Sequence, residues 1–336
     1  MRTYIYMLSI LYIVGCSNSP QYLFNENKPS ETISLIDYLC LDSIGLYGVG
    51  DFCIDNNNLL VRFKHPSSRD VLGMYNIDNN SYKSLVKRGR GPYEMLNCSS
   101  IFKYNRGYAI IDCNMPNIAV VNGDSVIYKK LTDKGASSCI SNGEYLISTG
   151  VYPDGRYRMS GLDDEFCDFF CSYPKSKYKD DLTIATTYIS NAMAMNPDNN
   201  RFVCVNYNSG IIDICNINSK SITLHKRLEY HYPDIVQSNN GIAVFKRNNI
   251  NGFYDVTCSR EYIYAIYSGK SYNESQLSIN KCDYLIIYDW DGNMIKCMKL
   301  EQPMSQIYYD IILNKLFGLV DIRDATYICE LHQSWI

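Results

Sequence analysis

The side chains that most often bind metals or carry out catalysis are few and scattered in this sequence. Its four histidines are His65, His225, His231 and His332. A metal site built from His65, His231 and Asp234 is conceivable in space, but no spacing in the sequence demands it. The chain contains neither Gly-x-Ser-x-Gly nor His-Glu-x-x-His, which are the motifs of two large classes of hydrolase. We therefore assign no catalytic residue, no metal and no cofactor.

Cys16 follows the features of an export signal. Arg2 supplies a positive charge, and residues 4–14 form an almost uninterrupted apolar run. A run of this length is typical of a signal peptide and too short to span a membrane. It ends in Ile-Val-Gly-Cys, which resembles a bacterial lipobox and predicts cleavage before Cys16 and acylation of that residue, palmitate included. An ordinary secretory signal with a coincidental cysteine is the alternative.

The segment after Cys16 is polar and contains two prolines. We therefore expect residues 1–15 to be a lipoprotein signal peptide, residues 16–30 to be the lipidated cysteine and a flexible tether, and residues 31–336 to be one domain. The lipid would be the only membrane anchor. Because no acidic run follows Cys16, we expect the protein at the outer membrane of the cell envelope with its domain in the periplasm. Surface display is the alternative.

Composition excludes several classes of protein. The chain has 336 residues, 46% of them hydrophobic, and its net charge is −3 with 32 basic and 35 acidic residues. This balance can bury a large core and lacks the basic excess of a nucleic-acid-binding protein, so we expect no nucleic-acid partner and a monomer. Of the 14 cysteines, most lie in apolar runs, as buried free thiols do. A hairpin turning at residues 208 and 209 would place Cys204 opposite Asp213 and Cys215 opposite Phe202, which prevents a disulfide between these two cysteines.

Beyond residue 30 the pattern is that of short strands separated by Asn, Asp, Gly and Ser. The strands form groups of four, and the second strand of each group begins near residue 59, 107, 144, 201, 261 or 314. A period of about fifty residues with four strands per unit is typical of a β-propeller. We predict an all-β, six-bladed β-propeller, in which even the ambiguous residues 183–195 favour a strand, with one running from Thr187 to Met193.

The sixth group contains only three strands, and one strand near residues 32–41 is left without a group. A ring closed by this N-terminal strand, paired with residues 325–331, explains both facts and removes two exposed sheet edges. A two-sheet sandwich is the alternative fold, but the number of strands is too large for one.

Three segments carry a family resemblance. Gly89-Arg-Gly-Pro-Tyr-Glu94 is similar to the Gly-x-Gly-Pro-Gly-Glu element of the TolB-like six-bladed propeller lipoproteins of gut anaerobes, although Tyr93 replaces a glycine of that pattern. Residues 261–269 and 288–292 look like the fifth blade of the same family. The resemblance implies the fold but no activity, because fold analogy does not supply one.

In a propeller, the loops from second to third strands and from fourth strands to the next blade emerge on one face. The two longest loops, 232–251 and 268–282, belong to this set, and long loops on a rigid scaffold often bind ligands. The face also gathers basic side chains, so we expect an acidic or hydroxyl-rich ligand near the channel mouth. The candidate ligand-binding residues are Arg69, Arg88, Arg90, Glu94, Tyr152, Lys270, Tyr272 and Arg323.

These observations predict a lipid-anchored, non-catalytic binding or scaffolding protein of the cell envelope. Its partner would be an envelope protein, a peptide or a glycan. The alternative is a propeller enzyme of the lyase or lactonase type with a metal in its channel. A channel with three or more converging His, Asp or Glu side chains would favour the enzyme, and a channel lined by Tyr, Asn and aliphatic residues would favour binding.

Overall fold

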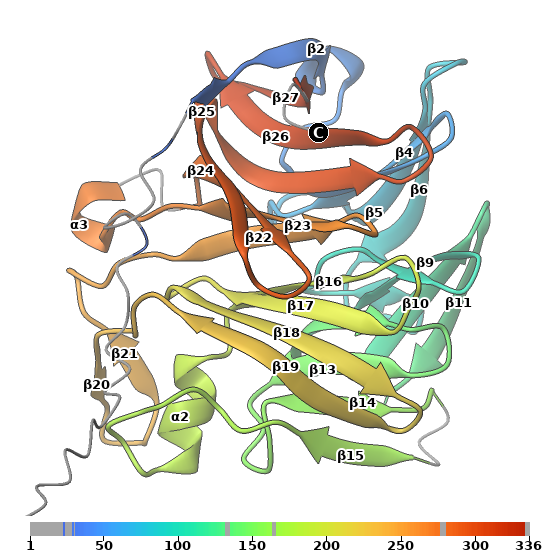
Figure 1. Ribbon diagram of the computed structural model, residues 1–336. Coiled ribbons are helices and arrows are strands. Elements are labelled where there is room, and N and C mark those ends of the chain that lie inside the picture. Colours follow the sequence, from blue (N-terminus) through green and yellow to red (C-terminus); the bar gives the residue numbers. More distant parts are fainter. Residues whose placement is uncertain are drawn as a thin grey trace, which may run out of the picture.

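The computed structural model describes residues 23, 29, 31–131, 135–162, 166–275 and 280–332, and strands dominate this part of the chain (Figure 1). The predicted signal peptide and Cys16, with most of the tether, lie outside the described residues. Within the described residues, no helix is both long enough and apolar enough to cross a membrane.

Four blades are separate sheets, antiparallel except for one short parallel pairing of β6 with β7 in blade 1. Blade 1 consists of β3 (Val49–Asp55), β4 (Asn58–Phe63), β5 (Asp70–Asn76) and β6 (Ser81–Arg88), extended by the short β7 (Glu94–Met95). Blade 2 consists of β8 (Phe102–Tyr104), β9 (Gly107–Ile111), β10 (Asn117–Asn122) and β11 (Ser125–Lys130). Blade 3 consists of β12 (Ala136–Ser141), β13 (Leu146–Gly150), β14 (Tyr157–Ser160) and β15 (Cys167–Phe170). Blade 4 consists of β16 (Asn191–Met195), β17 (Arg201–Asn206), β18 (Ile211–Asn218) and β19 (Ser221–Glu229).

The last two blades share one long strand, β25 (Met294–Asp310), which joins them into a single eight-stranded sheet. The first part of β25 pairs with β24 (Cys282–Asp289) and completes blade 5 with β22 (Phe253–Cys258) and β23 (Tyr262–Tyr267). Its second part pairs with β26 (Lys315–Ile322), which pairs with β27 (Ala325–Leu331) in blade 6.

The N-terminal strand closes the ring as predicted. β2 (Leu35–Cys40) lies antiparallel to β27, with Leu35 opposite Leu331 and Cys40 opposite Tyr327. The short β1 (Thr32–Ile33) adds a parallel pairing with β25. The six-bladed, all-β architecture is therefore confirmed, and blade 6 takes strands from both ends of the chain.

The core lies between blades, because both faces of each blade pack against a neighbour. In β17, the side chains of residues 202–205 are all fully buried, which explains why this strand reads as a continuous apolar run. One apolar cluster joins Leu59 and Val61 of blade 1 to Leu319 and Ile328 of blade 6, so the closure between the chain ends is packed like the other blade interfaces.

The cysteines are free thiols at all thirteen described positions, and nine of them are buried. The predicted register is also correct: Cys204 lies opposite Asp213, and Cys215 lies opposite Phe202. The prediction that most thiols are free and buried agrees with the structure.

The prediction of a strand beginning at Thr187 is wrong. Residues 181–187 form helix α2 (Asp181–Thr187), and the inner strand of blade 4 begins only at Asn191. Asp180 caps the helix, since its carboxylate accepts a hydrogen bond of 2.8 Å from the backbone N–H of Thr183. This cap, together with packing on the hairpin of β20 (Ile235–Gln237) and β21 (Ala243–Phe245), outweighs the strand preference of the β-branched residues.

Candidate ligand-binding face

The long connections gather on one side of the propeller. Figure 1 shows α2, the β20–β21 hairpin and the short helix α3 (Tyr272–Ser275) along the same side, at the left of the view. These elements lie in the connections from blade 3 to blade 4, from blade 4 to blade 5 and between β23 and β24. The predicted clustering of the two longest loops on one face is therefore confirmed.

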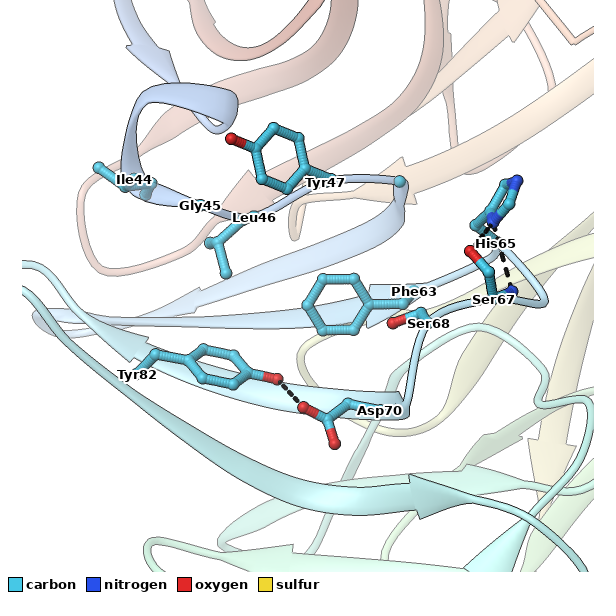
Figure 2. Close-up of a pocket in the computed structure, with 11 residues that line it drawn as sticks. Ile44, Gly45, Leu46, Tyr47, Phe63, His65, Ser67, Ser68, Asp70 and Tyr82 are labelled. Carbon is cyan, nitrogen blue, oxygen red and sulfur yellow. Dashed lines mark hydrogen bonds between the residues drawn. The ribbon is translucent and has the colours of Figure 1, made fainter.

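A groove of about 610 Å³ opens on this face above blade 1 (Figure 2). One wall is the connection from β2 to β3, which contains the 3-10 helix η1 (Asp42–Ile44) and residues 45–48; the other is the loop between β4 and β5. The buried Leu46 and Phe63 belong to its lining. Tyr47 is 64% exposed and Tyr82 is 41% exposed, so two aromatic side chains of the groove face solvent.

Asp70 fixes the polar side of the groove. Its carboxylate accepts hydrogen bonds of 2.7 Å from the Tyr82 hydroxyl and 2.7 Å from the Ser84 hydroxyl. Burial, together with Asp70, raises the pKa of Tyr82 above its usual value, so the phenol remains a donor at neutral pH. Nearby, His65 Nδ1 lies 2.5 Å from the Ser67 hydroxyl, which orients the exposed imidazole at the rim (Figure 2). Aromatic faces beside a carboxylate, an imidazole and hydroxyls suit a hydroxylated ring: the faces stack and the polar groups hydrogen-bond.

The channel mouth lies next to the groove, because Lys64 directly precedes His65. A Cβ atom on Gly50 of β3 would overlap the aliphatic part of Lys64, so the lysine side chain passes directly over this glycine. Its ammonium lies 3.4 Å from the Tyr254 hydroxyl and 5.4 Å from the Tyr254 ring centre. The Tyr254 ring contacts Tyr207 edge-on, with ring centres 5.0 Å apart. Lys64 of blade 1, Tyr254 of blade 5 and Tyr207 of blade 4 therefore meet at the channel mouth.

Two of the predicted ligand-binding residues bond to backbone groups instead, Arg88 at the groove wall and Glu94 in its own turn. Arg88 donates hydrogen bonds to the backbone carbonyls of Ser68 (3.1 Å), Leu96 (2.6 Å) and Phe63 (2.9 Å). Glu94 accepts a hydrogen bond of 2.8 Å from the backbone N–H of Gly91. Replacing Arg88 would leave three carbonyls without this donor, so we do not expect the change to be neutral for folding.

The remaining predicted residues are spread over the face. Tyr152 is buried, and its hydroxyl lies 2.9 Å from that of Ser148. Lys270 forms an ion pair with Asp283, and the Tyr272 hydroxyl donates to Asn208 at 2.8 Å. The residues Arg69, Arg90 and Arg323 are exposed.

The groove residues Tyr47, Phe63, Asp70 and Tyr82 were not predicted from the sequence. The signal available was the segment Gly45-Leu-Tyr-Gly48, in which glycines flank an aromatic residue between two strands. Gly48 adopts a φ of 69°, a left-handed conformation that glycine accepts readily. This turn places Tyr47 on the surface. The other groove residues, Phe63, Asp70 and Tyr82, belong to strands of blade 1 that lie beside this turn only in the folded protein.

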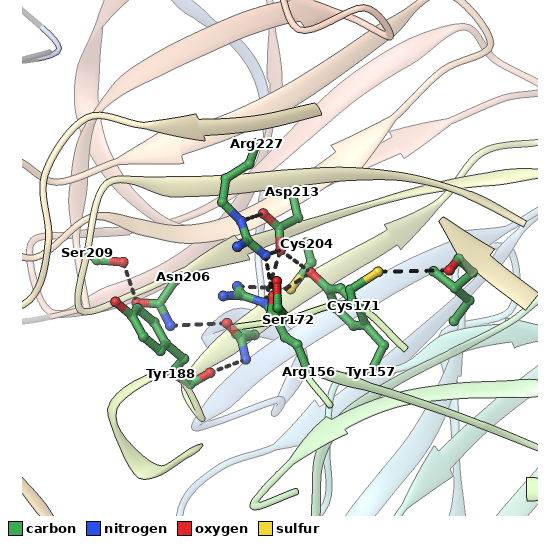
Figure 3. A network of polar contacts seen from close by, with 12 residues as sticks. Arg156, Tyr157, Cys171, Ser172, Tyr188, Cys204, Asn206, Ser209, Asp213 and Arg227 are labelled. Atoms are coloured by element: carbon green, nitrogen blue, oxygen red, sulfur yellow. Dashed lines mark hydrogen bonds and ion pairs between the residues drawn. The ribbon is translucent and has the colours of Figure 1, made fainter. Parts of the chain in front are cut away.

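A second polar cluster lies inside the protein, between blades 3 and 4. Figure 3 shows Arg156 and Arg227 converging on Asp213. Asp213 is fully buried and lies 3.1 Å from Arg156 Nε, 2.6 Å from Arg227 Nε and 2.7 Å from the Tyr157 hydroxyl. Burial raises the pKa of Asp213, but the two arginines outweigh it and hold the pKa below its usual value. This cluster ties two blades together and is remote from the groove residues in sequence and in blade.

In the part of the chain that the structure describes, no three His, Cys, Asp or Glu side chains are grouped so that they could hold a metal ion. The acidic residues of the inner strands, Asp51 and Asp255, accept backbone hydrogen bonds from Ile101 and Ile307.

Comparison with known proteins agrees with this architecture. A family model described as TolB-like 6-blade propeller-like matches residues 54–310. A Bacteroides fragilis protein described as exported is 14% identical with a TM-score of 0.62, covering 93% of this chain and 98% of its own. A DUF4221 family member from Bacteroides vulgatus is 11% identical with a TM-score of 0.57, covering 91% and 99%. An auxiliary nutrient binding protein from Bacteroides thetaiotaomicron is 10% identical with a TM-score of 0.53, covering 85% and 69%. No curated protein matches the sequence.

Proposed function

Because the chain belongs to the TolB-like six-bladed propeller family, whose fold alone assigns no activity, we propose from its groove that it is a binding protein of the cell envelope that captures a glycan. The observation that carries this proposal is the pairing of Tyr47, 64% exposed, with Tyr82 and the Asp70 carboxylate in one groove. Aromatic side chains bind the apolar face of a sugar ring, while carboxylate and hydroxyl groups bind its hydroxyls. A folded envelope protein as the partner would need a larger interface than this groove offers.

The N-terminal sequence supports an envelope location. In this proposal, Cys16 carries the lipid that holds the protein at the outer membrane, and the segment after it links the lipid to the propeller. Nutrient binding by a Bacteroides protein of the same fold is consistent with a role in capturing sugars. The second candidate function is a lyase or lactonase with a channel metal; among the described residues, no three His, Cys, Asp or Glu side chains are grouped so that they could hold that metal.

A binding screen tests the groove. The full-length protein, held in detergent, is exposed to a panel of neutral and acidic oligosaccharides, and binding is measured by calorimetry. We expect binding of at least one glycan and a loss of about tenfold or more in affinity for Tyr47→Ala, because the stacking surface is removed.

The matched control is Tyr93→Ala, since Tyr93 is an equally exposed tyrosine at 70% that does not line the groove. Binding that survives Tyr47→Ala and Asp70→Ala unchanged would place the ligand elsewhere. Binding that is lost only when the opposite loops at residues 56–58, 79–80 and 122–124 are altered would show that the face is assigned the wrong way round.

A further inference from the structure

Lys64 occupies an unusual position for a lysine that ends a strand. It follows β4, the second strand of blade 1, yet it contacts Tyr254 on the innermost strand of blade 5. Blade 6 lies between these two blades, so the side chain must reach across the mouth of the channel to make this contact. Gly50 allows the crossing, because any larger residue there would occupy the path of the lysine.

Lys64 as a whole residue is exposed, and its ammonium forms no ion pair with any residue that the structure describes. Its one hydrogen-bonding partner is a neutral tyrosine hydroxyl. Burial among the surrounding elements and the charge of Arg62 lower the pKa of Lys64 to about 8, which still leaves it mostly protonated at pH 7. A cation in this position gains more from an anionic partner than a cation in open water does.

The nearby carboxylates do not neutralise this part of the channel. Asp51 accepts hydrogen bonds from the backbone of Phe52 and Ile101 and lies 3.7 Å from Arg62. Burial and the proximity of Asp51 raise the pKa of Asp255 to about 8, so it carries little charge at neutral pH. Asp321, the third carboxylate close enough to act on Lys64, forms an ion pair with Lys281, so none of the three carboxylates is paired with the Lys64 ammonium.

Tyrosine rings lie beside the ammonium. Tyr254 and Tyr207 meet edge-to-face beside it. Tyr272, whose hydroxyl donates to the Asn208 side chain, follows on the neighbouring connection. A carboxylate attached to a small organic skeleton would pair with the ammonium while its carbon atoms contact these rings.

From this geometry we propose that the channel mouth is an anion-binding position in which Lys64 pairs with the carboxylate of a small acidic ligand. The proposal rests on the proposed function in one respect: the glycan in the groove and the acidic ligand at Lys64 bind on the same face of the propeller. The carboxylate could belong to an acidic sugar or to a simple organic acid, and the chemistry at Lys64 is the same for both.

The test uses the full-length protein in detergent at pH 7 and constant ionic strength. Glucuronate, succinate and glucose are titrated separately, and binding is followed by ligand-observed NMR. We expect glucuronate or succinate to bind more tightly than glucose, and binding of glucuronate alone would identify an acidic sugar as the source of the carboxylate. Lys64→Met, which keeps a long side chain over Gly50, should weaken carboxylate binding about tenfold or more, whereas Lys64→Arg should retain it.

Two controls separate this site from the groove. Lys83→Met removes an exposed lysine that pairs with Asp124 at 3.1 Å outside the channel mouth and should leave carboxylate binding unchanged. Tyr47→Ala should also leave it unchanged, even where it abolishes glycan binding in the groove. The proposal is overturned if neither carboxylate binds better than glucose, if Lys64→Met binds as tightly as the natural protein with its melting temperature intact, or if Tyr47→Ala abolishes carboxylate binding.

Discussion

Asp51 and Asp255 occupy the same position in two different blades and make the same contact with the next blade. Asp51 accepts a hydrogen bond of 2.7 Å from the backbone N–H of Ile101, and Asp255 accepts one of 2.8 Å from the backbone N–H of Ile307. In both strands the pairing register shifts just before the aspartate, and the bulge turns the side chain toward the neighbouring blade. Each carboxylate therefore ties its blade to the first strand of the following one.

Asp255 should make the stability of the protein depend on pH. Because burial and Asp51 raise its folded pKa to about 8 from 3.8, the folded state binds this proton more tightly than the unfolded state does. The proton on Asp255 therefore stabilises the folded state fully below about pH 4. This contribution to the free energy of unfolding is lost as the pH rises through 8, at up to about 1.4 kcal/mol per pH unit. Asp255→Asn keeps an oxygen acceptor for Ile307 and cannot ionise.

The measurement is urea unfolding of both proteins at pH 5, 6.5 and 8.5. The stability of Asp255→Asn relative to the natural protein should increase with pH. Parallel pH profiles for the two proteins would contradict the assignment of a raised pKa to this residue.

Asp213 should be the most costly single charge to remove from the interior. Asp213→Ala would leave Arg156 and Arg227 buried or half-buried without their common anion, and such a loss costs about 3–5 kcal/mol. The control is Asp124→Ala, which breaks the exposed pair with Lys83 and should cost at most about 1 kcal/mol. Chemical denaturation measures both, and similar small losses for the two variants would contradict a structural role for the buried cluster.

The N-terminal strand should be required for full stability. Deleting residues 31–41 removes β2 and exposes the edge of β27, so the melting temperature should fall by several degrees. Deleting only residues 17–22, which keeps the buried Leu23, serves as the control and should not change it. An unchanged melting temperature after the first deletion would count against closure of the ring by this strand.

Cys16 should determine where the protein resides in the cell. Cys16→Ala removes the proposed lipid attachment site, so the variant should move from the membrane fraction to the soluble envelope fraction. Fractionation followed by a carbonate wash measures this. A variant that remains bound to the membrane after the wash would show that the lipid on Cys16 is not the anchor.

The fold could be predicted because its signals are local and repeated. Strand runs such as residues 202–205 and the fifty-residue period do not depend on distant contacts, and a strand missing from blade 6 matched an unassigned one near Leu35. Helix α2 could not be predicted as easily, because Thr183 and Ile184 favour strands. The helix depends on the Asp180 cap and on contacts such as the hydrogen bond of 2.7 Å from the Thr183 hydroxyl to the Gly241 carbonyl.

The candidate site was harder to predict because it is assembled by ring closure. Tyr47 comes from the connection out of blade 6, whereas Phe63 and Asp70 come from blade 1. Arg88 was predicted to bind a ligand because it is basic. Its guanidinium group instead donates hydrogen bonds to three backbone carbonyls. Basic residues in the sequence suggest which face binds a ligand, and only the fold shows which side chains form a groove on that face.

The claim that this propeller binds a glycan in the groove above blade 1 is tested most directly by one comparison. Affinities of the full-length protein, Tyr47→Ala and Tyr93→Ala for the same oligosaccharide are measured by calorimetry under identical conditions. We predict that Tyr47→Ala weakens binding about tenfold or more while Tyr93→Ala binds like the natural protein. Equal affinities for all three proteins would contradict the account.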